Sequence, residues 1–399
     1  MLIGALLAHS LNAVHAGPVV ELPASGLRAE QLAVVYLAGN ADSEKIARYY
    51  QAARQIPARN VVPIKLDATQ TVIDPGVFSV QKKALDARLD PNIQAYALAW
   101  AQPYRVGCMS ISAAFAFGFD VAYCAQGCKL TRSSPYYHAG SVAPFTDFAL
   151  RPTMLLATNN FNDARALIDR GVAADDTQPF GTAYLLQTSD RARSVRSVFY
   201  AEAQRGFAGV FDVQVLQQDA IANRSSILFY FTGKSQVDGL DTLEFLPGAM
   251  ADHLTSYGGM LTNSKQMSAM RWLEAGATGS YGTALEPCAF NQKFPNPVLA
   301  MWHYATGSTL LEAYWKSVQM PGQGNFIGEP LAAPYAGYRL RRAGRTLRVY
   351  SPVLRRGSYK IYRNDFGVER LLAIQQLKRN QRYLELTPPF SQSYRIERM

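Results

Sequence analysis

Residues Leu32–Ala38 read LAVVYLA, and a polar turn and a helical pattern follow directly. A continuous apolar run of this length is typical of a strand that is buried on both faces of a parallel sheet. Asn40 begins the sequence Asn-Ala-Asp-Ser, which is suited to cap the start of a helix. Ile46 and Tyr50 then lie on one stripe of the predicted helix Ser43–Gln55. A strand followed at once by an amphipathic helix is the repeating unit of an α/β fold.

The same alternation continues through the first two thirds of the chain. The predicted strands are Val61–Leu66, Gln94–Ala101, Met154–Thr158, Ala183–Thr188, Val213–Gln217, Ile227–Thr232 and Gly279–Leu285. The predicted helices are Asn162–Arg170, Ser194–Arg205, Pro247–Leu254, Met267–Ala275, Val298–Tyr304 and Leu310–Val318. This order predicts a mostly parallel sheet with helices on both faces. In such sheets a functional site lies beyond the carboxyl ends of the strands.

Residues 336–399 differ in pattern and in charge. Short alternating runs, interrupted by Gly344, Gly357 and Pro388-Pro389, predict a small β-sandwich-like domain. This segment holds 15 basic and 4 acidic side chains, and 13 of the basic ones are Arg. Residues 1–335 hold 25 basic and 26 acidic side chains, so the net charge of +10 comes from the last segment. We therefore divide the chain into residues 1–16, an α/β domain over 17–335 and a basic Arg-rich β domain over 336–399.

Residues 1–16 read MLIGALLAHSLNAVHA, an apolar run that ends in small residues, as a signal peptide does. We expect an exported protein of the periplasm or the cell surface. An oxidising compartment favours disulfides, although four cysteines allow three pairings and the sequence does not choose among them. The cysteines are Cys108, Cys124, Cys128 and Cys288. A zinc site is disfavoured, because only His138 lies near three of them in the sequence.

The candidate catalytic residues lie late in the α/β domain: Cys288 follows the predicted strand Gly279–Leu285, and His253 lies at the end of the predicted helix Pro247–Leu254, next to Asp252. A nucleophilic thiol needs a base or a cation nearby, and Cys288 lies just beyond a predicted strand, with His253 as the candidate base. Glu286 lies two residues before this cysteine and is placed to orient an imidazole. Ser256 is a second candidate nucleophile, although the G-x-S-x-G elbow is absent. The structural alternatives stay open: a disulfide-bonded cysteine, a capping histidine and a turn serine.

The Arg-rich segment supplies the candidate anion-binding residues, Arg339, Arg341, Arg345, Arg348, Arg355 and Arg356. Arginine presents a planar fork of donors that fits carboxylate, sulfate or phosphate. Residues two apart in a strand share a face, so Arg339 and Arg341 are expected to project together. For an exported protein the expected partners are anionic polysaccharide, lipopolysaccharide or membrane headgroups, and no nucleic acid. The alternative is a solvated basic surface without a partner.

No internal apolar run reaches the length of a transmembrane span, so we expect none in the mature chain. No G-x-G-x-x-G follows the first predicted strand and no P-loop is present, so no cofactor is expected. Glu329, in the sequence Gly-Glu-Pro, has two interpretations, a functional acid or part of a tight turn.

The stretch from Leu246 to Pro334 carries a family resemblance. It contains LPGAMADHLTSYGG, WLEAGATGSYGTALEPC and GQGNFIGEPLAAP. It resembles an uncharacterised family of exported bacterial proteins that co-occurs with exosortase, a membrane enzyme of a protein-sorting and exopolysaccharide system. The segments VVYLAGNADSEKIARYYQAARQIPARNVV and YRVGCMSISAAFAFGFD fit the same family. The resemblance implies a Gram-negative bacterium that makes exopolysaccharide, and it implies no particular reaction.

A second resemblance is to gingipain-type cysteine peptidases. It rests on the helix after the first strand, the late strand with the sequence GATGSYGT, and the closing Gly-Glu-Pro turn. This family has a caspase-like α/β sheet followed by an immunoglobulin-like domain. Its members have a His at the end of one strand and the catalytic Cys at the end of the next. Here Thr232 is followed by Gly-Lys, and the next strand end offers Thr255 and Ser256, so the dyad is absent from its expected places.

We therefore interpret the chain as an exported envelope- or matrix-associated protein with a caspase-like fold. It lacks the standard His/Cys dyad and binds an anionic ligand. The alternative is a cysteine-dependent hydrolase, a peptidase that uses Cys288 with His253.

Overall fold

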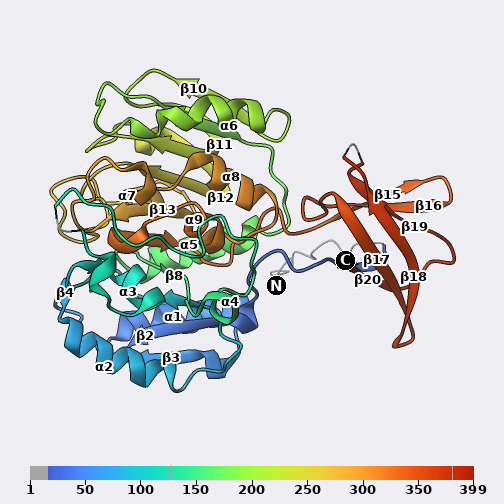
Figure 1. Ribbon diagram of the computed structural model, residues 1–399, viewed down its shortest axis with the longest axis horizontal. Helices are drawn as coiled ribbons and strands as arrows, with labels where there is room; N and C mark the ends of the chain where they lie inside the picture. The colour runs from blue at the N-terminus through green and yellow to red at the C-terminus, as the bar shows by residue number, and fades with distance from the viewer. Residues whose placement is uncertain (1–16, 126, 380) are drawn as a thin grey trace, which may run out of the picture. The chain divides into compact units, whose positions relative to one another are not determined.

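The computed structural model describes residues 17–125, 127–379 and 381–399 (Figure 1). They form two compact units: residues 24–337, here called the α/β unit, and residues 338–399 together with 17–23, here called the small β unit. Strand β1 (Val19–Glu21) pairs in parallel with the last strand, β20 (Ser393–Arg398). Residues 17–23 therefore belong to the small β unit and not, as the sequence suggested, to the α/β domain. The predicted signal peptide, residues 1–16, lies outside the described residues.

A ten-stranded sheet forms the centre of the α/β unit. In spatial order its strands are β10 (Asp212–Leu216), β9 (Thr182–Leu186), β11 (Arg224–Thr232), β12 (Leu243–His253), β13 (Gly279–Thr283), β14 (Gly324–Gly328), β8 (Thr153–Leu155), β5 (Ala95–Leu98), β2 (Leu32–Leu37) and β3 (Val61–Ile64). Neighbours are parallel except β13 and β14, which are antiparallel. The sheet thus has two parallel halves of opposite direction, whose carboxyl ends lie at opposite edges.

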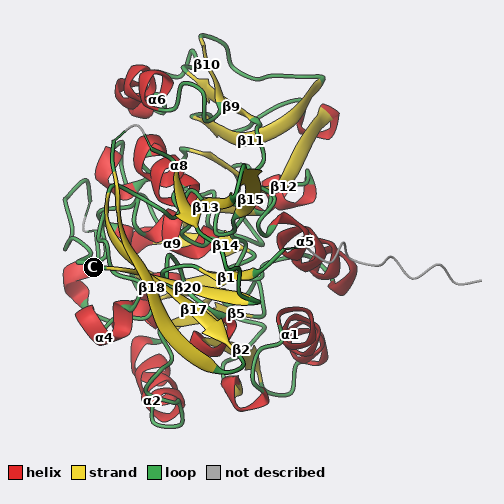
Figure 2. Cartoon of the chain, turned by 90° about the vertical axis from the view of Figure 1, so that its right-hand side faces the viewer, coloured by secondary structure: helices red, strands yellow, loops and turns green. Residues whose placement is uncertain are grey.

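Helices cover both faces of this sheet. They are α1 (Ala41–Arg54), α2 (Pro75–Asp86), α3 (Ile111–Phe117), α4 (Pro144–Phe148), α5 (Phe161–Ala174), α6 (Tyr200–Gly206), α7 (Met270–Glu274), α8 (Pro297–Ala305) and α9 (Leu310–Trp315). The buried apolar side chains of α1, α6, α8 and α9 belong to one core cluster, and those of α2 and most of α3 belong to another. Figure 2 shows α1 and α2 on opposite sides of β2. Short strands β4 (Val72–Ile73), β6 (Arg105–Val106) and β7 (Met109–Ser110) form a separate three-stranded sheet. The predicted α/β class, with a mostly parallel sheet between helices, is confirmed.

The first strand and helix form for the reasons that the sequence gives. Every residue of β2 except Tyr36 is buried, as expected of a strand covered on both faces. The side chain of Asn40 accepts a hydrogen bond from the backbone N–H of Ser43 and caps α1. Ile46 and Tyr50 then face the core. No helix among the described residues is long and apolar enough to cross a membrane.

The predicted helix Pro247–Leu254 is wrong, because this segment is the second half of the long strand β12. Its register against β11 shifts between the pairs Ile227–Phe245 and Phe229–Met250. Gly248 has φ of +88° within this irregular stretch, a conformation that glycine adopts without strain. Burial between β11 and β13 overrides the helical preference of the sequence PGAMADHL.

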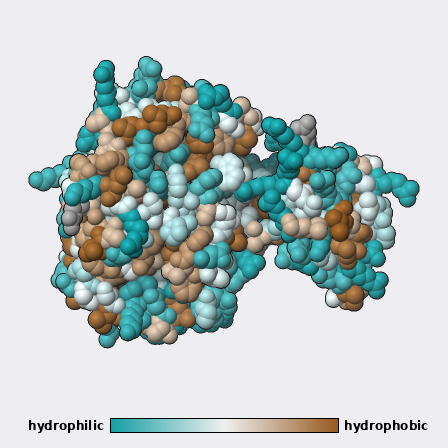
Figure 3. Space-filling view, viewed as in Figure 1, coloured by the Kyte–Doolittle hydropathy of each residue, from teal (hydrophilic) through white to brown (hydrophobic). Residues whose placement is uncertain are grey.

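The small β unit contains two sheets. One has the order β1, β20, β17 (Gly357–Asp365), β18 (Val368–Leu377), and the other has the order β15 (Arg339–Ala343), β16 (Thr346–Tyr350), β19 (Tyr383–Leu386). Their shared core includes Val349, Tyr359, Leu384 and Ile396, and the predicted β-rich C-terminal region is confirmed. Figure 3 shows mostly hydrophilic residues on the visible face of this unit, with a hydrophobic patch among them.

Candidate functional site

The carboxyl ends of β11, β12 and β13 lie next to one another at one edge of the sheet, at Thr232, His253 and Thr283. Of the predicted catalytic residues, His253 ends β12 and Ser256 follows it, whereas Glu286 and Cys288 follow β13. Each of those residues has a structural partner.

Cys288 is not a free thiol. Its sulfur is bonded to that of Cys128, with the Cα atoms 5.5 Å apart, and Cys108 is bonded to Cys124. These two bonds account for all four cysteines of the chain. A nucleophile must be a thiolate, so the prediction that Cys288 acts as a nucleophile is wrong for the oxidised protein. The sequence left the pairing open, and the structure selects one of the three possibilities.

His253 is buried, with 1% of its surface exposed, and both ring nitrogens are hydrogen-bonded. Trp272 Nε1 donates to Nδ1 over 2.9 Å, so Nε2 carries the proton and donates to the carbonyl oxygen of Met267 over 3.0 Å. Burial lowers the pKa of His253 to about 4. The side chain is therefore a neutral core histidine, and its predicted role as a catalytic base is wrong.

The neighbouring Asp252 forms an ion pair with Arg196, and each of these two side chains is only 1% exposed. Arg196 Nη1 lies 2.6 Å from Asp252 Oδ1, in an ion pair whose angles differ from those of a hydrogen bond. The same guanidinium donates to the carbonyl oxygen of Thr232 over 2.6 Å. Burial raises the pKa of Asp252 to about 6. This pair ties β12 to β11 and to the segment before α6.

Glu286 and Ser256 form turns. Glu286 Oε1 accepts the backbone N–H of Cys288 over 2.8 Å, which fixes a turn in which Cys288 has φ of +56°. The carbonyl oxygen of half-buried Ser256 accepts from Thr283 Oγ1 over 2.9 Å. No hydrogen bond between Glu286 and an imidazole is found among the described residues, so the predicted arrangement is not assembled.

Sequence reasoning missed a polar network at the same edge. Arg193 Nε donates to Thr255 Oγ1 over 3.2 Å, and this hydroxyl donates to Gln266 Oε1 over 2.8 Å. Lys234 forms an ion pair with Asp219 over 2.7 Å. No sequence pattern pointed to these contacts, because they join separate loops of the chain. The network satisfies the polar groups of the loops that close this edge of the sheet.

Glu329, the other candidate acid, is fully buried. It accepts hydrogen bonds from Tyr50 Oη over 2.5 Å and from Arg54 Nε over 3.0 Å. A Cβ at Gly171 would collide with its side chain, so α5 approaches this carboxylate closely. The side chain joins the end of β14 to α1, which is a structural role.

The arginines of the small β unit are the predicted site residues that the structure brings together. β15 and β16 pair so that Arg341 lies opposite Arg348 and Arg339 lies opposite Tyr350. β16 and β19 pair so that Arg348 lies opposite Glu385 and Tyr350 opposite Tyr383. Directly paired residues share a face of a sheet. We call this set the Arg/Tyr face: Arg339, Arg341, Arg348, Tyr350, Tyr383 and Glu385.

Contacts within the Arg/Tyr face hold the side chains in place. Arg348 Nε lies 3.0 Å from Glu385 Oε1, and the guanidinium lies 4.3 Å from the centre of the Tyr383 ring. The guanidinium of Arg341 lies 5.5 Å from the centre of the Tyr350 ring. The two tyrosine rings are 5.2 Å apart. Three arginines and one glutamate leave an excess of two positive charges beside two aromatic rings.

The opposite face of this three-stranded sheet is apolar. Val349, Leu384 and Leu386 are buried in the core of the small β unit, which sets the direction in which the arginines project. Arg345 lies in the turn between β15 and β16. Two other arginines, Arg355 and Arg356, lie in the loop before β17, outside this sheet. Sequence alternation identified the arginines, whereas the contribution of the tyrosines depends on the register.

No family model and no curated protein matches this sequence. Two solved structures are similar to the chain. One is a complex of the pro- and mature domains of RgpB from Porphyromonas gingivalis, with 8% identity and a TM-score of 0.45, covering 91% of this chain and 94% of that one. The other is described as a protease, with 11% identity and a TM-score of 0.39, covering 96% of this chain and 95% of that one. At these values neither similarity bears on the chemistry of this chain.

Proposed function

We propose that this chain is an exported, envelope- or matrix-associated protein that binds an anionic polysaccharide through the Arg/Tyr face. The observation that carries the proposal is the strand register, which places Arg341 opposite Arg348 and Tyr350 opposite Tyr383. Guanidinium groups bind carboxylate or sulfate, and flat aromatic rings pack against the faces of sugar rings. The two disulfides are consistent with the oxidising periplasm or cell surface.

The α/β unit is, in this proposal, a caspase-like scaffold without the His/Cys dyad. The exosortase-associated, exopolysaccharide-producing setting is part of the same proposal and rests on the sequence resemblance. The alternative of a peptidase that uses Cys288 and His253 has lost its support, because one residue is disulfide-bonded and the other is a buried neutral imidazole.

The test compares two triple variants of the full chain that lose the same charge. One replaces Arg339, Arg341 and Arg348 by Gln, and the matched control replaces three exposed basic residues of the same unit by Gln. The control residues are Arg370, Lys378 and Arg379. Both proteins are eluted with salt from immobilised heparin and from immobilised polygalacturonate. We expect the first variant to elute at clearly lower salt than the wild type, and the control variant to stay close to it.

Equal shifts for the two variants would overturn the proposal, because net charge alone would then account for retention. Sedimentation with anionic phosphatidylglycerol vesicles tests the other partner class. Binding to vesicles without binding to either polysaccharide would replace the proposed partner by a membrane surface. Replacing Tyr350 and Tyr383 by Ala is expected to weaken binding further, whereas Phe at these positions retains it.

A further inference from the structure

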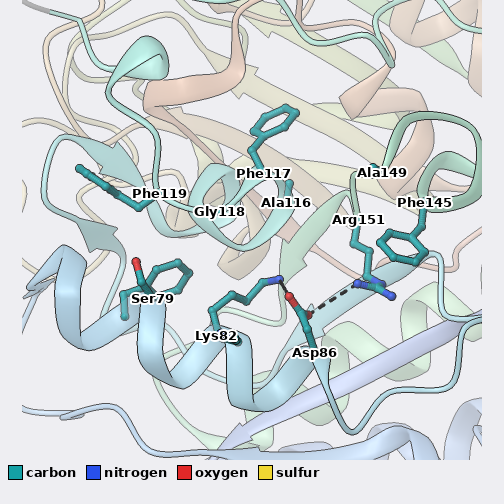
Figure 4. A pocket seen from close by; sticks show the side chains of 12 residues that line it. Ser79, Lys82, Asp86, Ala116, Phe117, Gly118, Phe119, Phe145, Ala149 and Arg151 are labelled. Carbon is teal, nitrogen blue, oxygen red and sulfur yellow. Dashed lines mark hydrogen bonds and ion pairs between the residues drawn. The ribbon is translucent and has the colours of Figure 1, made fainter.

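A second site lies in the α/β unit, far along the chain from the Arg/Tyr face. A cavity of about 380 Å³ opens between α2, the end of α3 and the segment 145–151 (Figure 4). Four aromatic rings line it, those of Phe78, Phe117, Phe119 and Phe145. The volume falls at the lower end of the range for small-molecule sites. We call this cavity the α2–α3 pocket.

Three charged side chains meet inside the α2–α3 pocket. Figure 4 shows Lys82 and Arg151 reaching Asp86 from opposite sides. Lys82 Nζ lies 2.5 Å from Asp86 Oδ2, and Arg151 Nη1 lies 3.6 Å from Asp86 Oδ1. Tyr96 also donates its hydroxyl hydrogen to Oδ1. One carboxylate therefore serves two cations.

The two cations are held in position by other contacts. Arg151 Nε donates to the carbonyl oxygen of Ile93 over 2.9 Å, and its guanidinium stacks on the Phe145 ring, 3.3 Å from the ring centre. The side chains of Lys82 and Arg151 are only 11% and 8% exposed. Burial lowers the pKa of Lys82 because its charged form is poorly solvated there.

This arrangement leaves one buried positive charge without a full counter-charge. Burying a charge is costly unless an opposite charge compensates it, and the electrostatic attraction of a ligand anion is strong where water is largely excluded. Among the described residues Lys82 Nζ is hydrogen-bonded to Asp86 alone, which leaves two of its three N–H bonds for a ligand. We infer that the α2–α3 pocket binds a small organic acid with one carboxylate and a flat apolar body.

Each half of this ligand has its own partners. The carboxylate is bound by Lys82 and Arg151, which together present both a point charge and a planar donor fork. The apolar body lies against the rings of Phe117 and Phe119, which bury flat apolar surface. A neutral amide with the same apolar body would keep the contact with the phenylalanine rings and lose the ion pairs with Lys82 and Arg151.

The test uses 3-phenylpropionate and its neutral amide, 3-phenylpropanamide, with the full chain in isothermal titration calorimetry. We expect saturable binding of one acid per chain and at least tenfold weaker binding of the amide. Equal affinities would overturn the role of the two cations. No saturable binding of the acid up to 10 mM, on the order of the weakest affinities that define a site, would overturn the pocket itself.

Two variants change the charge in opposite directions. Lys82→Gln is expected to weaken binding of the acid about tenfold. Asp86→Asn removes the competing carboxylate and is expected to strengthen it, an outcome that a merely structural role of these residues does not produce. Weakening by both variants would overturn the inference. If the first variant fails to fold, the second variant and the amide still decide.

A matched control replaces a lysine that also lies beside a phenylalanine ring but does not line the α2–α3 pocket. Lys45 of α1 also lies beside a phenylalanine ring, 4.1 Å from the centre of Phe161, but outside the pocket. Lys45→Gln is expected to leave the affinity unchanged. The triple variant of the Arg/Tyr face is also expected to bind the acid like the wild type. If the triple variant abolishes binding and Lys82→Gln does not, the acid binds to the small β unit and the pocket is excluded.

Discussion

Removing the Cys128–Cys288 disulfide tests the bond that keeps Cys288 from being a free thiolate. The double variant Cys128→Ser/Cys288→Ser opens a bond between residues 160 apart in sequence. Cys108→Ser/Cys124→Ser opens a bond with a separation of only 16. A cross-link restricts the unfolded chain, and the restriction grows with the length of the loop that it closes. The two bonds are thus a matched pair within one chain.

The loop-closure description gives the magnitudes. The 160-residue separation corresponds to a loss of about 5 kcal/mol in the free energy of unfolding at 25 °C. The 16-residue separation corresponds to about 3 kcal/mol. The difference of about 2 kcal/mol depends only on the tenfold ratio of the loop lengths, so it is more secure than either value.

Urea unfolding followed by tryptophan fluorescence measures both losses. All four tryptophans of the chain lie in the α/β unit, so the signal reports that unit alone, although the chain has two units. Trp100, Trp272 and Trp315 are buried and change environment on unfolding. The wild type, as a control, should resist alkylation until it is reduced. Equal losses, or a larger loss for the shorter loop, would refute the reasoning.

Two further predictions concern buried charges in the α/β unit. Between pH 6.5 and 4, His253 and Asp252 have opposite effects on the free energy of unfolding. The pKa of His253 is lowered to about 4, so its contribution to this free energy falls as the pH falls. The pKa of Asp252 is raised to about 6, so its contribution rises as the pH falls. The Asp252→Asn variant lacks the contribution of Asp252, so its free energy of unfolding should fall by about 3 kcal/mol relative to that of the wild type over this pH interval. Parallel pH profiles of the two proteins in urea unfolding would contradict this. Glu329→Gln leaves the buried guanidinium of Arg54 with one fewer counter-charge, and we expect a loss of about 3 kcal/mol; a urea midpoint like that of the wild type would show that this pair contributes nothing.

The sequence predicted the α/β class because β2, β5 and residues 227–231 of β11 are continuous apolar runs, whose burial on both faces leaves little choice of structure. It failed at β12, where PGAMADHL contains good helix formers and no β-branched residue. It also missed β14, so it did not predict that a strand runs antiparallel to β13 at the centre of the sheet. That orientation depends on pairing between distant segments, which local preference does not encode.

For the candidate site, the sequence showed which residues have reactive side chains but not whether the fold brings them together. Cys288 follows a predicted strand and His253 ends a predicted helix, which made a catalytic pair possible. In the structure, Cys288 is bonded to Cys128, 160 positions away, and His253 accepts a hydrogen bond from Trp272. Arg339 and Arg341 were predicted to share a face from the period of a strand alone, and the register confirms it. The period of a strand was therefore sufficient to predict which side chains share a face within one hairpin. It could not predict contacts between segments that are distant in the sequence.

The Arg/Tyr face and the α2–α3 pocket share one physical arrangement. In each, cations outnumber the carboxylate beside them: Asp86 contacts both Lys82 and Arg151, and Glu385 contacts Arg348, which lies opposite Arg341. The carboxylate orients a cation and leaves positive charge for a ligand. They differ in exposure: Arg348 is 35% exposed, whereas Arg151 is 8% exposed. Salt screens exposed charges far more than buried ones, so rising ionic strength should release a polymer from the face while a small acid stays in the pocket.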